Sequence, residues 1–204
     1  VWDRVVFTAL LGKINPLLVV AGAAIIGMLC FVVALNKGWF TVDKPGGVRG
    51  YQIALGLSVF FFINAILLDW GFRFDRGINV LPPKGLLYYP VMGFIVEMLF
   101  HVLLLTLLMF AITNIFRGMD TGHAMWISIV LVSLVEPVFQ VVIGLKEGGL
   151  DLFAILTGVH ILLINLGQLA IFKYYGFSTT FFLRMFYYSL WHVIWGVLRL
   201  KIFF

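Results

Sequence analysis

Charged residues are scarce in this sequence, and their scarcity indicates the class of protein. Only 11% of the 204 residues are charged, whereas 63% are hydrophobic, and the mean hydropathy is +1.10. Soluble globular domains carry about 25% charged residues, so the composition excludes that class. The sequence predicts an all-α, polytopic integral membrane protein.

Cysteine is nearly absent, and no internal repeat is found. The one cysteine, Cys30, lies within an apolar run, so the sequence excludes an internal disulfide and a cysteine-based metal site. Without a repeat or a second compositional region, we expect a single helical membrane domain over residues 1–204. Because the first residue is Val1 rather than Met, we also expect the sequence to begin within a longer natural chain.

Six apolar runs are each long enough to cross a bilayer, which takes about 20 helical residues at about 1.5 Å each. They cover approximately residues 16–35, 51–70, 88–116, 124–145, 152–172 and 179–200. Residues 1–15 mix apolar and charged side chains and are too polar to span, which is typical of an amphipathic segment in the membrane interface. We therefore expect about six transmembrane helices, preceded by an interfacial segment.

Basic residues indicate the orientation of these helices. The net charge is +5, and the basic residues lie in loops and at helix ends, so we predict membrane lipids and no nucleic acid as partners. If six helices alternate, eight basic residues share the side of the two termini and six lie opposite. This bias favours both termini in the cytoplasm, and we expect the cell (plasma) membrane. At the end of the second run, Asp69, Arg73 and Asp75 suggest an interfacial anchor with local ion pairs.

The third apolar run contains two titratable residues, Glu97 and His101. Placing a carboxylate mid-membrane costs about 2.5 kcal/mol or more, so such residues usually face a protein interior and mark a functional site. The spacing of four residues puts both side chains on one helix face, one turn apart.

Three further predicted helices each carry a titratable group at a similar depth. Counted from the nearest helix end on the side of the termini, Glu97, Glu136, His160 and His192 all lie eight or nine residues in. Helical rise places them about 12 to 14 Å from one surface. We therefore predict that they converge. Each also has a structural interpretation: Glu97 as a hydrogen-bonded pair with His101, Glu136 as a partner of the backbone groups that Pro137 frees, His160 as a hydrogen-bonding residue between helices, and His192 as a packing residue.

Two carboxylates and up to three imidazoles suit two kinds of chemistry. They provide His and Glu ligands for a divalent metal such as zinc, and they equally provide a Glu general base acting on a water that His residues polarise. The amides Asn165, Gln140 and Gln168 can orient the reacting group or stabilise an oxyanion. The sequence alone leaves both alternatives open.

Three segments resemble the CAAX-protease and bacteriocin-processing family of intramembrane proteases, also called the CPBP or Abi family. They are VEMLFH at 96–101, HILLIN at 160–165 and RMFYYSLWHVIWG at 184–196, and the resemblance covers residues 88–200. In that family a glutamate and histidines from separate helices are taken to activate water for peptide hydrolysis within the membrane. The resemblance implies a membrane-associated peptide or protein substrate.

The resemblance implies the following roles. Glu97 would be the general base, His160 and His192 would polarise water or bind a metal together with Glu97, and Glu136, His101 and Asn165 would assist. The main rival hypothesis is a non-catalytic helical subunit or scaffold of a larger membrane complex, whose polar residues join helices and whose partners are other subunits. A haem or pigment carrier and a transporter are further alternatives.

Overall fold

The computed structural model describes residues 16–44, 47–147 and 151–204. The interfacial segment expected at residues 1–15 lies outside this range. The described chain contains helices and connections and no strand. In order, the elements are α2 (Pro16–Asn36), α3 (Gly47–Phe72), α4 (Lys84–Val96), η1 (Glu97–Leu103), α5 (Leu104–Ile115), α6 (Thr121–Glu147), α7 (Leu152–Tyr175), α8 (Phe177–Tyr188), η2 (Ser189–Trp195) and α9 (Gly196–Phe203).

Four of the described helices are long and apolar enough to cross a membrane. They are Val48–Phe72, Lys84–Ile115, Thr121–Phe139 and Leu152–Tyr175. Large apolar side chains cover their outer faces; Leu67 is 64% exposed. Because lipid accommodates such a surface and water does not, the protein is a helical integral membrane protein, as predicted. The count of six spans and the orientation stay predictions.

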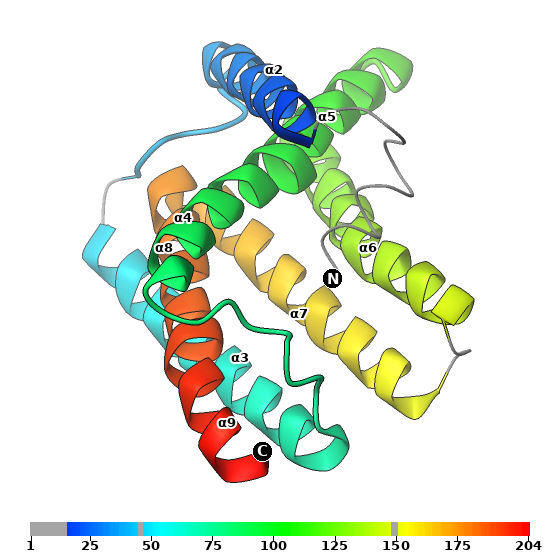
Figure 1. Ribbon diagram of the computed structural model, residues 1–204. Helices are drawn as coiled ribbons and strands as arrows, with labels where there is room; N and C mark the ends of the chain where they lie inside the picture. The colour runs from blue at the N-terminus through cyan, green and yellow to red at the C-terminus, as the bar shows by residue number, and fades with distance from the viewer. Residues whose placement is uncertain (1–15, 45–46, 148–150) are drawn as a thin grey trace.

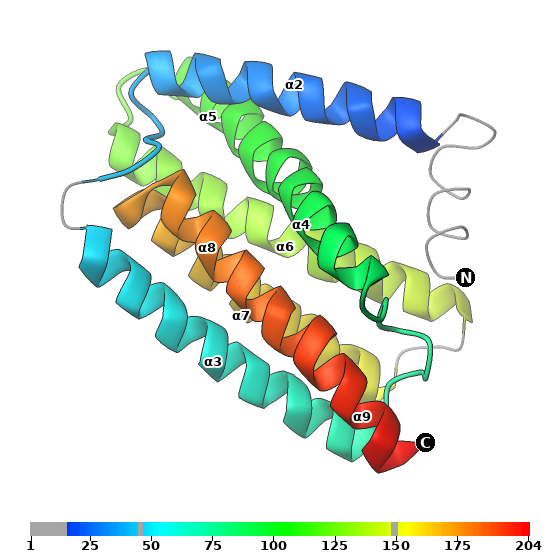
Figure 2. The ribbon, with the colours of Figure 1, turned by 60° about the vertical axis from the view of Figure 1, so that its left-hand side comes forward.

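The helices form one bundle in which segments distant in sequence lie side by side. The continuous helix made of α8, η2 and α9 runs along α3, and α7 packs against both (Figures 1 and 2). On the other side, α4, η1 and α5 form a second continuous helix, whose α5 part contacts α6. Helix α2 lies at the edge and packs mainly on η1 (Figure 2).

Both long composite helices contain a seven-residue π-helical segment at mid-length. These segments are η1 and η2, and each follows an α-helical segment without a break in the helix. A π-helical turn is rare, and it frequently occurs at functional sites. In this protein, η1 carries Glu97 and His101, and η2 carries His192.

A tight turn at Gly176 sets α8 against α7. Gly176 has a φ of 92°, in the region that favours glycine, and a Cβ there would lie 2.6 Å from the Val42 carbonyl oxygen. That same oxygen accepts a hydrogen bond from the Ser178 N–H in the first turn of α8 at 3.0 Å. The turn brings Gln168 of α7 beside Arg184 of α8.

A buried ion pair joins the end of α3 to α9. Arg199 donates from Nε to Asp69 Oδ2 at 2.7 Å and from Nη2 to Oδ1 at 2.9 Å, and both side chains are buried. Trp195 Nε1–H and the Phe74 N–H also donate to this carboxylate, at 2.8 and 2.9 Å. Asp69 therefore pairs with a residue 130 positions away, and not with a local basic residue as the sequence suggested.

Candidate functional site

A second buried ion pair joins η1 to α8. Arg184 Nε donates to Glu97 Oε2 at 2.7 Å, and the two side chains are 3% and 0% exposed. His101 Nδ1 lies 2.9 Å from Oε1 of the same carboxylate. Because a carboxylate only accepts hydrogen bonds, this contact assigns the ring proton of His101 to Nδ1. Both oxygens of Glu97 are thus engaged.

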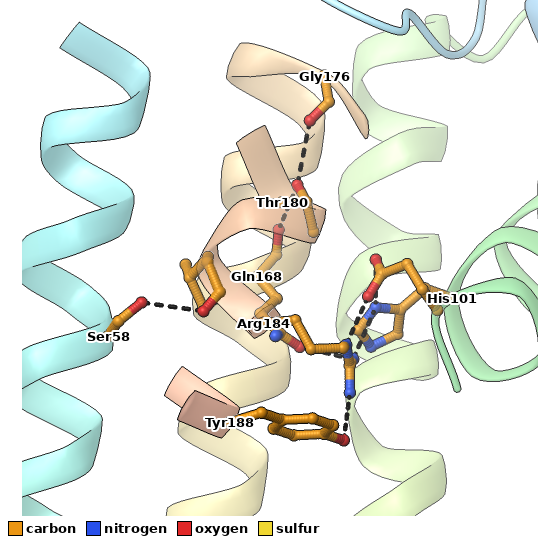
Figure 3. Close-up of polar contacts among 9 residues, drawn as sticks. Ser58, His101, Gln168, Gly176, Thr180, Arg184 and Tyr188 are labelled. Carbon is orange, nitrogen blue, oxygen red and sulfur yellow. Dashed lines mark hydrogen bonds and ion pairs between the residues drawn. The ribbon is translucent and has the colours of Figure 1, made fainter. Parts of the chain in front are cut away.

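Each nitrogen of the Arg184 guanidinium has a partner within the bundle. In addition to the bond from Nε, Nη1 donates to the Tyr188 hydroxyl at 3.2 Å, and Nη2 donates to Gln168 Oε1 at 2.7 Å (Figure 3). Glu97 compensates the charge of the guanidinium. The network therefore links three helices, α4–η1–α5, α7 and α8, through charge-assisted hydrogen bonds.

A pocket of about 280 Å³ lies beside Arg184. Its apolar wall is formed by α3, the connection that follows α3, α7 and η2, and includes Ala65, Phe74, Ile78, Ile161, Ile164 and Trp191. Its polar wall comes from α6, α7, α8 and η2, and consists of Glu136, Thr157, His160, Asn165, Gln168, Arg184, Tyr187, Tyr188 and His192. A concave pocket in which polar side chains converge beside an apolar wall is a usual form of a ligand or active site.

The two pocket histidines are held in defined orientations. His160 Nε2 lies 3.3 Å from the Tyr187 hydroxyl. His192 Nδ1 lies 3.2 Å from Asn79 Nδ2, and its ring stacks on Tyr89 with centroids 4.3 Å apart. Since an amide nitrogen only donates, Nδ1 of His192 accepts, and the neutral ring carries its proton on Nε2.

The structure brings four of the six predicted site residues to one pocket. Glu136, His160, Asn165 and His192 all line it. Glu97 and His101 do not line the pocket. Glu97 is linked to it through the ion pair with Arg184, and His101 through its hydrogen bond to Glu97.

The structure does not gather the predicted metal ligands Glu97, His160 and His192 at one point. Within residues 16–44, 47–147 and 151–204, no group of three His, Cys, Asp or Glu side chains is close enough to hold an ion. The Glu97 oxygens already bind His101 and Arg184, and the two histidines bind different partners.

Several residues of the site were not predicted to belong to it. Arg184 had a sequence signal, since a charged residue inside an apolar run is expensive and needs a partner. Gln168, by contrast, was one of the amides predicted to orient the reacting group, and it lines the pocket. Asn79 had no sequence signal, because it lies in a loop and only the fold of the chain brings it into contact with His192.

Comparisons of this chain with protein-family models, with curated proteins and with solved structures gave no match.

Proposed function

We propose that the protein is an intramembrane hydrolase that cleaves an amide bond of a membrane-associated peptide or protein. The observation that carries the proposal is the gathering of Glu136, His160 and His192 around one pocket inside a helical membrane bundle. Carboxylate and imidazole groups side by side are the usual equipment for proton transfer to and from a reacting water. The resemblance to the CPBP family points to the same reaction class.

The residues of the pocket are sufficient for the hydrolysis of an amide bond. The Glu136 carboxylate takes a proton from a water, whose oxygen forms a bond to the carbonyl carbon while the C=O electron pair moves to oxygen. The Nε2–H of His192 donates to that oxyanion. When the pair returns, the C–N bond breaks and the leaving nitrogen takes the proton from Glu136, which gives a carboxyl product and an amine.

The proposal assigns the role of base to Glu136 rather than to Glu97. Glu97 does not line the pocket, and His101 and Arg184 already donate to its two oxygens. Glu97 instead fixes Arg184, which in turn holds the Gln168 amide at the pocket wall. Glu97 thus acts as a positioning residue.

The proposal includes a topology of six spans with both termini in the cytoplasm of the cell membrane. In addition to the four long apolar helices, α2 and the continuous helix Phe177–Phe203 would cross the bilayer. The latter is less apolar because it carries Arg184 and Arg199, but the structure buries both and pairs each with a carboxylate. Paired charges of this kind are tolerated inside a membrane protein.

The experiment is a search for cleavage products. Purified protein in lipid nanodiscs is incubated with a library of transmembrane peptides, and new termini are identified by mass spectrometry. Products should appear with the wild type and with Asp43→Asn, an exposed carboxylate in the loop after α2, and should be absent with Glu136→Gln. The proposal would be refuted if the wild type gave no products, or if Glu136→Gln gave the same amount of product as the wild type.

A second candidate function is a non-catalytic subunit of a larger membrane complex. The observation in its favour is that His160 and His192 each bind a partner within the bundle, Tyr187 and Asn79, as residues that join helices do. Purification from the native membrane in a mild detergent distinguishes the two. Stoichiometric partner subunits, together with no cleavage, would favour the subunit.

A further inference from the structure

Gln168 presents an unpartnered hydrogen-bond donor to the pocket. The side chain is 1% exposed and lines the pocket. Its Oε1 accepts from Arg184 Nη2 at 2.7 Å, which fixes the amide, because the flipped orientation would set two donors against each other. Figure 3 shows the amide nitrogen turned away from Arg184. None of the described residues accepts a hydrogen bond from this Nε2.

A second polar atom on the same helix, the hydroxyl of Thr157, also lacks a partner in the described part of the chain and can donate a hydrogen bond. Thr157 Oγ1 is buried and also belongs to the pocket lining. Leaving a buried donor without an acceptor costs about 1–3 kcal/mol. The pocket is therefore built to receive a group that accepts hydrogen bonds.

The charges of the pocket lining indicate the net charge of the ligand that would accept these hydrogen bonds. Arg184 is the one basic side chain with a permanent charge among the described residues that line the pocket, and Glu97 already compensates it at 2.7 Å. Glu136 lines the same pocket, so an anionic ligand would meet a carboxylate and no uncompensated cation. A cationic ligand would meet the N–H groups of Gln168. A neutral hydrogen-bond acceptor is compatible with both the Glu136 carboxylate and the Gln168 N–H groups.

We propose that Gln168 Nε2 binds the carbonyl oxygen of a neutral amide whose apolar flank lies against Phe74, Ile164 and Trp191. The inference rests on the proposed function in one respect, since the bound amide would be the bond that is cleaved. The size agrees with one amide and a short apolar flank, because 280 Å³ corresponds to about nine water molecules at roughly 30 Å³ each. Gln168 is a binding residue in this account and transfers no proton.

The test uses octanamide labelled with ¹³C at its carbonyl, and full-length protein in nanodiscs. Binding is measured by calorimetry, and isotope-edited infrared difference spectra report the carbonyl stretch of the bound ligand. Octanoate and octylammonium serve as charged analogues. The wild type should bind octanamide more tightly than either analogue, and the bound carbonyl should absorb at a lower frequency than in a hydrocarbon solvent, because a hydrogen bond weakens the C=O bond.

Two variants separate the donor of Gln168 from its other contacts. Gln168→Glu keeps an oxygen for Arg184 and removes the N–H donors, whereas Gln168→Met removes both. Each should raise the Kd for octanamide about 3- to 10-fold, the loss expected for one neutral hydrogen bond, and should shift the carbonyl band upward. Gln52→Glu, an exposed position of α3 away from the pocket, should change neither.

Three results would decide the matter. The inference would be overturned if the wild type and both Gln168 variants bound octanamide with equal affinity and showed the same carbonyl band. The Gln168 N–H would then donate to a buried water and not to the ligand. Tighter binding of octanoate than of octanamide would also overturn the inference. Octanamide binding that depends on Gln168 and survives Glu136→Gln, in a protein that cleaves no peptide, would support the inference while the proposed function fails.

Discussion

Glu97 Oε2 and Arg184 Nε lie 2.7 Å apart, although the two residues are 87 positions apart in the sequence. This ion pair ties η1 to α8 next to the pocket. It also orients the Gln168 amide, since Arg184 Nη2 donates to Oε1 of that residue. The pair is therefore the link between the packing of the bundle and the chemistry proposed for the pocket.

Removing one partner of this pair should destabilise the bundle strongly. Arg184→Met leaves the Glu97 carboxylate buried beside His101 alone, and the loss of one buried charge typically costs about 3–5 kcal/mol. Unfolding in mixed micelles gives the free energy. The double variant Glu97→Leu with Arg184→Met should recover part of the loss, because it leaves no unpaired charge. A double variant less stable than Arg184→Met would contradict this account.

The Asp69–Arg199 pair should be as important for stability as the first pair. Asp69→Asn removes the charge that accepts from Arg199, Trp195 and the Phe74 N–H, and we expect a loss of about 3–5 kcal/mol. Asp75→Asn is the matched control, because its side chain is exposed and only its backbone carbonyl accepts from Arg199. The control should stay within about 0.5 kcal/mol of the wild type. Equal losses in the two variants would refute the assignment.

The close approach of α2 to η1 should depend on Gly27. A Cβ at this position would lie 2.9 Å from Met98 Cβ and 3.0 Å from the Met98 carbonyl oxygen, which cannot move aside easily. Gly27→Val should therefore displace α2, with a loss of about 1–3 kcal/mol from overpacking. Gly22→Val, where nothing lies within 4 Å, is the control. Crosslinking between cysteines placed in α2 and η1 would measure the displacement, and unchanged crosslinking in Gly27→Val would contradict it.

The sequence predicted local features of the site well and its long-range contacts poorly. The four-residue spacing of Glu97 and His101 predicted one shared face, and their side chains are in contact at 2.9 Å. The ion pair between Glu97 and Arg184 could not be predicted, because no local sequence pattern relates the two residues. Similarly, the basic neighbours of Asp69 suggested local pairing, whereas its partner comes from α9.

The two π-helical segments were also beyond sequence reasoning. Hydrophobic periodicity assumes the α-helical repeat, and the apolar residues of η1 and η2 fit that repeat well enough to hide the extra residue in each turn. The predicted depths of Glu97 and His192 were based on α-helical rise. They still placed His192 on the same pocket as Glu136 and His160, because all three lie on helices that run side by side.

The loop before α6 should show a pH dependence caused by Asp120. The backbone N–H of His123 donates to Asp120 Oδ2 at 3.1 Å, and this bond, followed by the contact with the His123 ring, lowers the pKa of the carboxyl below its usual value. A lowered pKa means that the carboxylate stabilises the folded state above the ordinary aspartate range near 3.9. The contribution is lost as the pH falls through the lower folded-state pKa.

A ¹³C NMR titration of the Asp120 carboxyl measures this shift directly. In His123→Ala the backbone N–H remains, so the pKa of Asp120 should stay below that of a model aspartate while rising above the wild-type value. If the pKa of Asp120 in the wild type equals that of an aspartate in an unstructured peptide, the hydrogen bond at the start of α6 is contradicted.

The most direct test of the central claim is the rate of peptide cleavage by Glu136→Gln, compared with the wild type in the same nanodiscs. If Glu136 transfers the proton, the single-turnover rate should fall about 10²- to 10⁴-fold, while the unfolding temperature and octanamide binding stay near their wild-type values. A rate within twofold of the wild type would contradict the claim that the pocket lined by Glu136, His160 and His192 carries out the reaction.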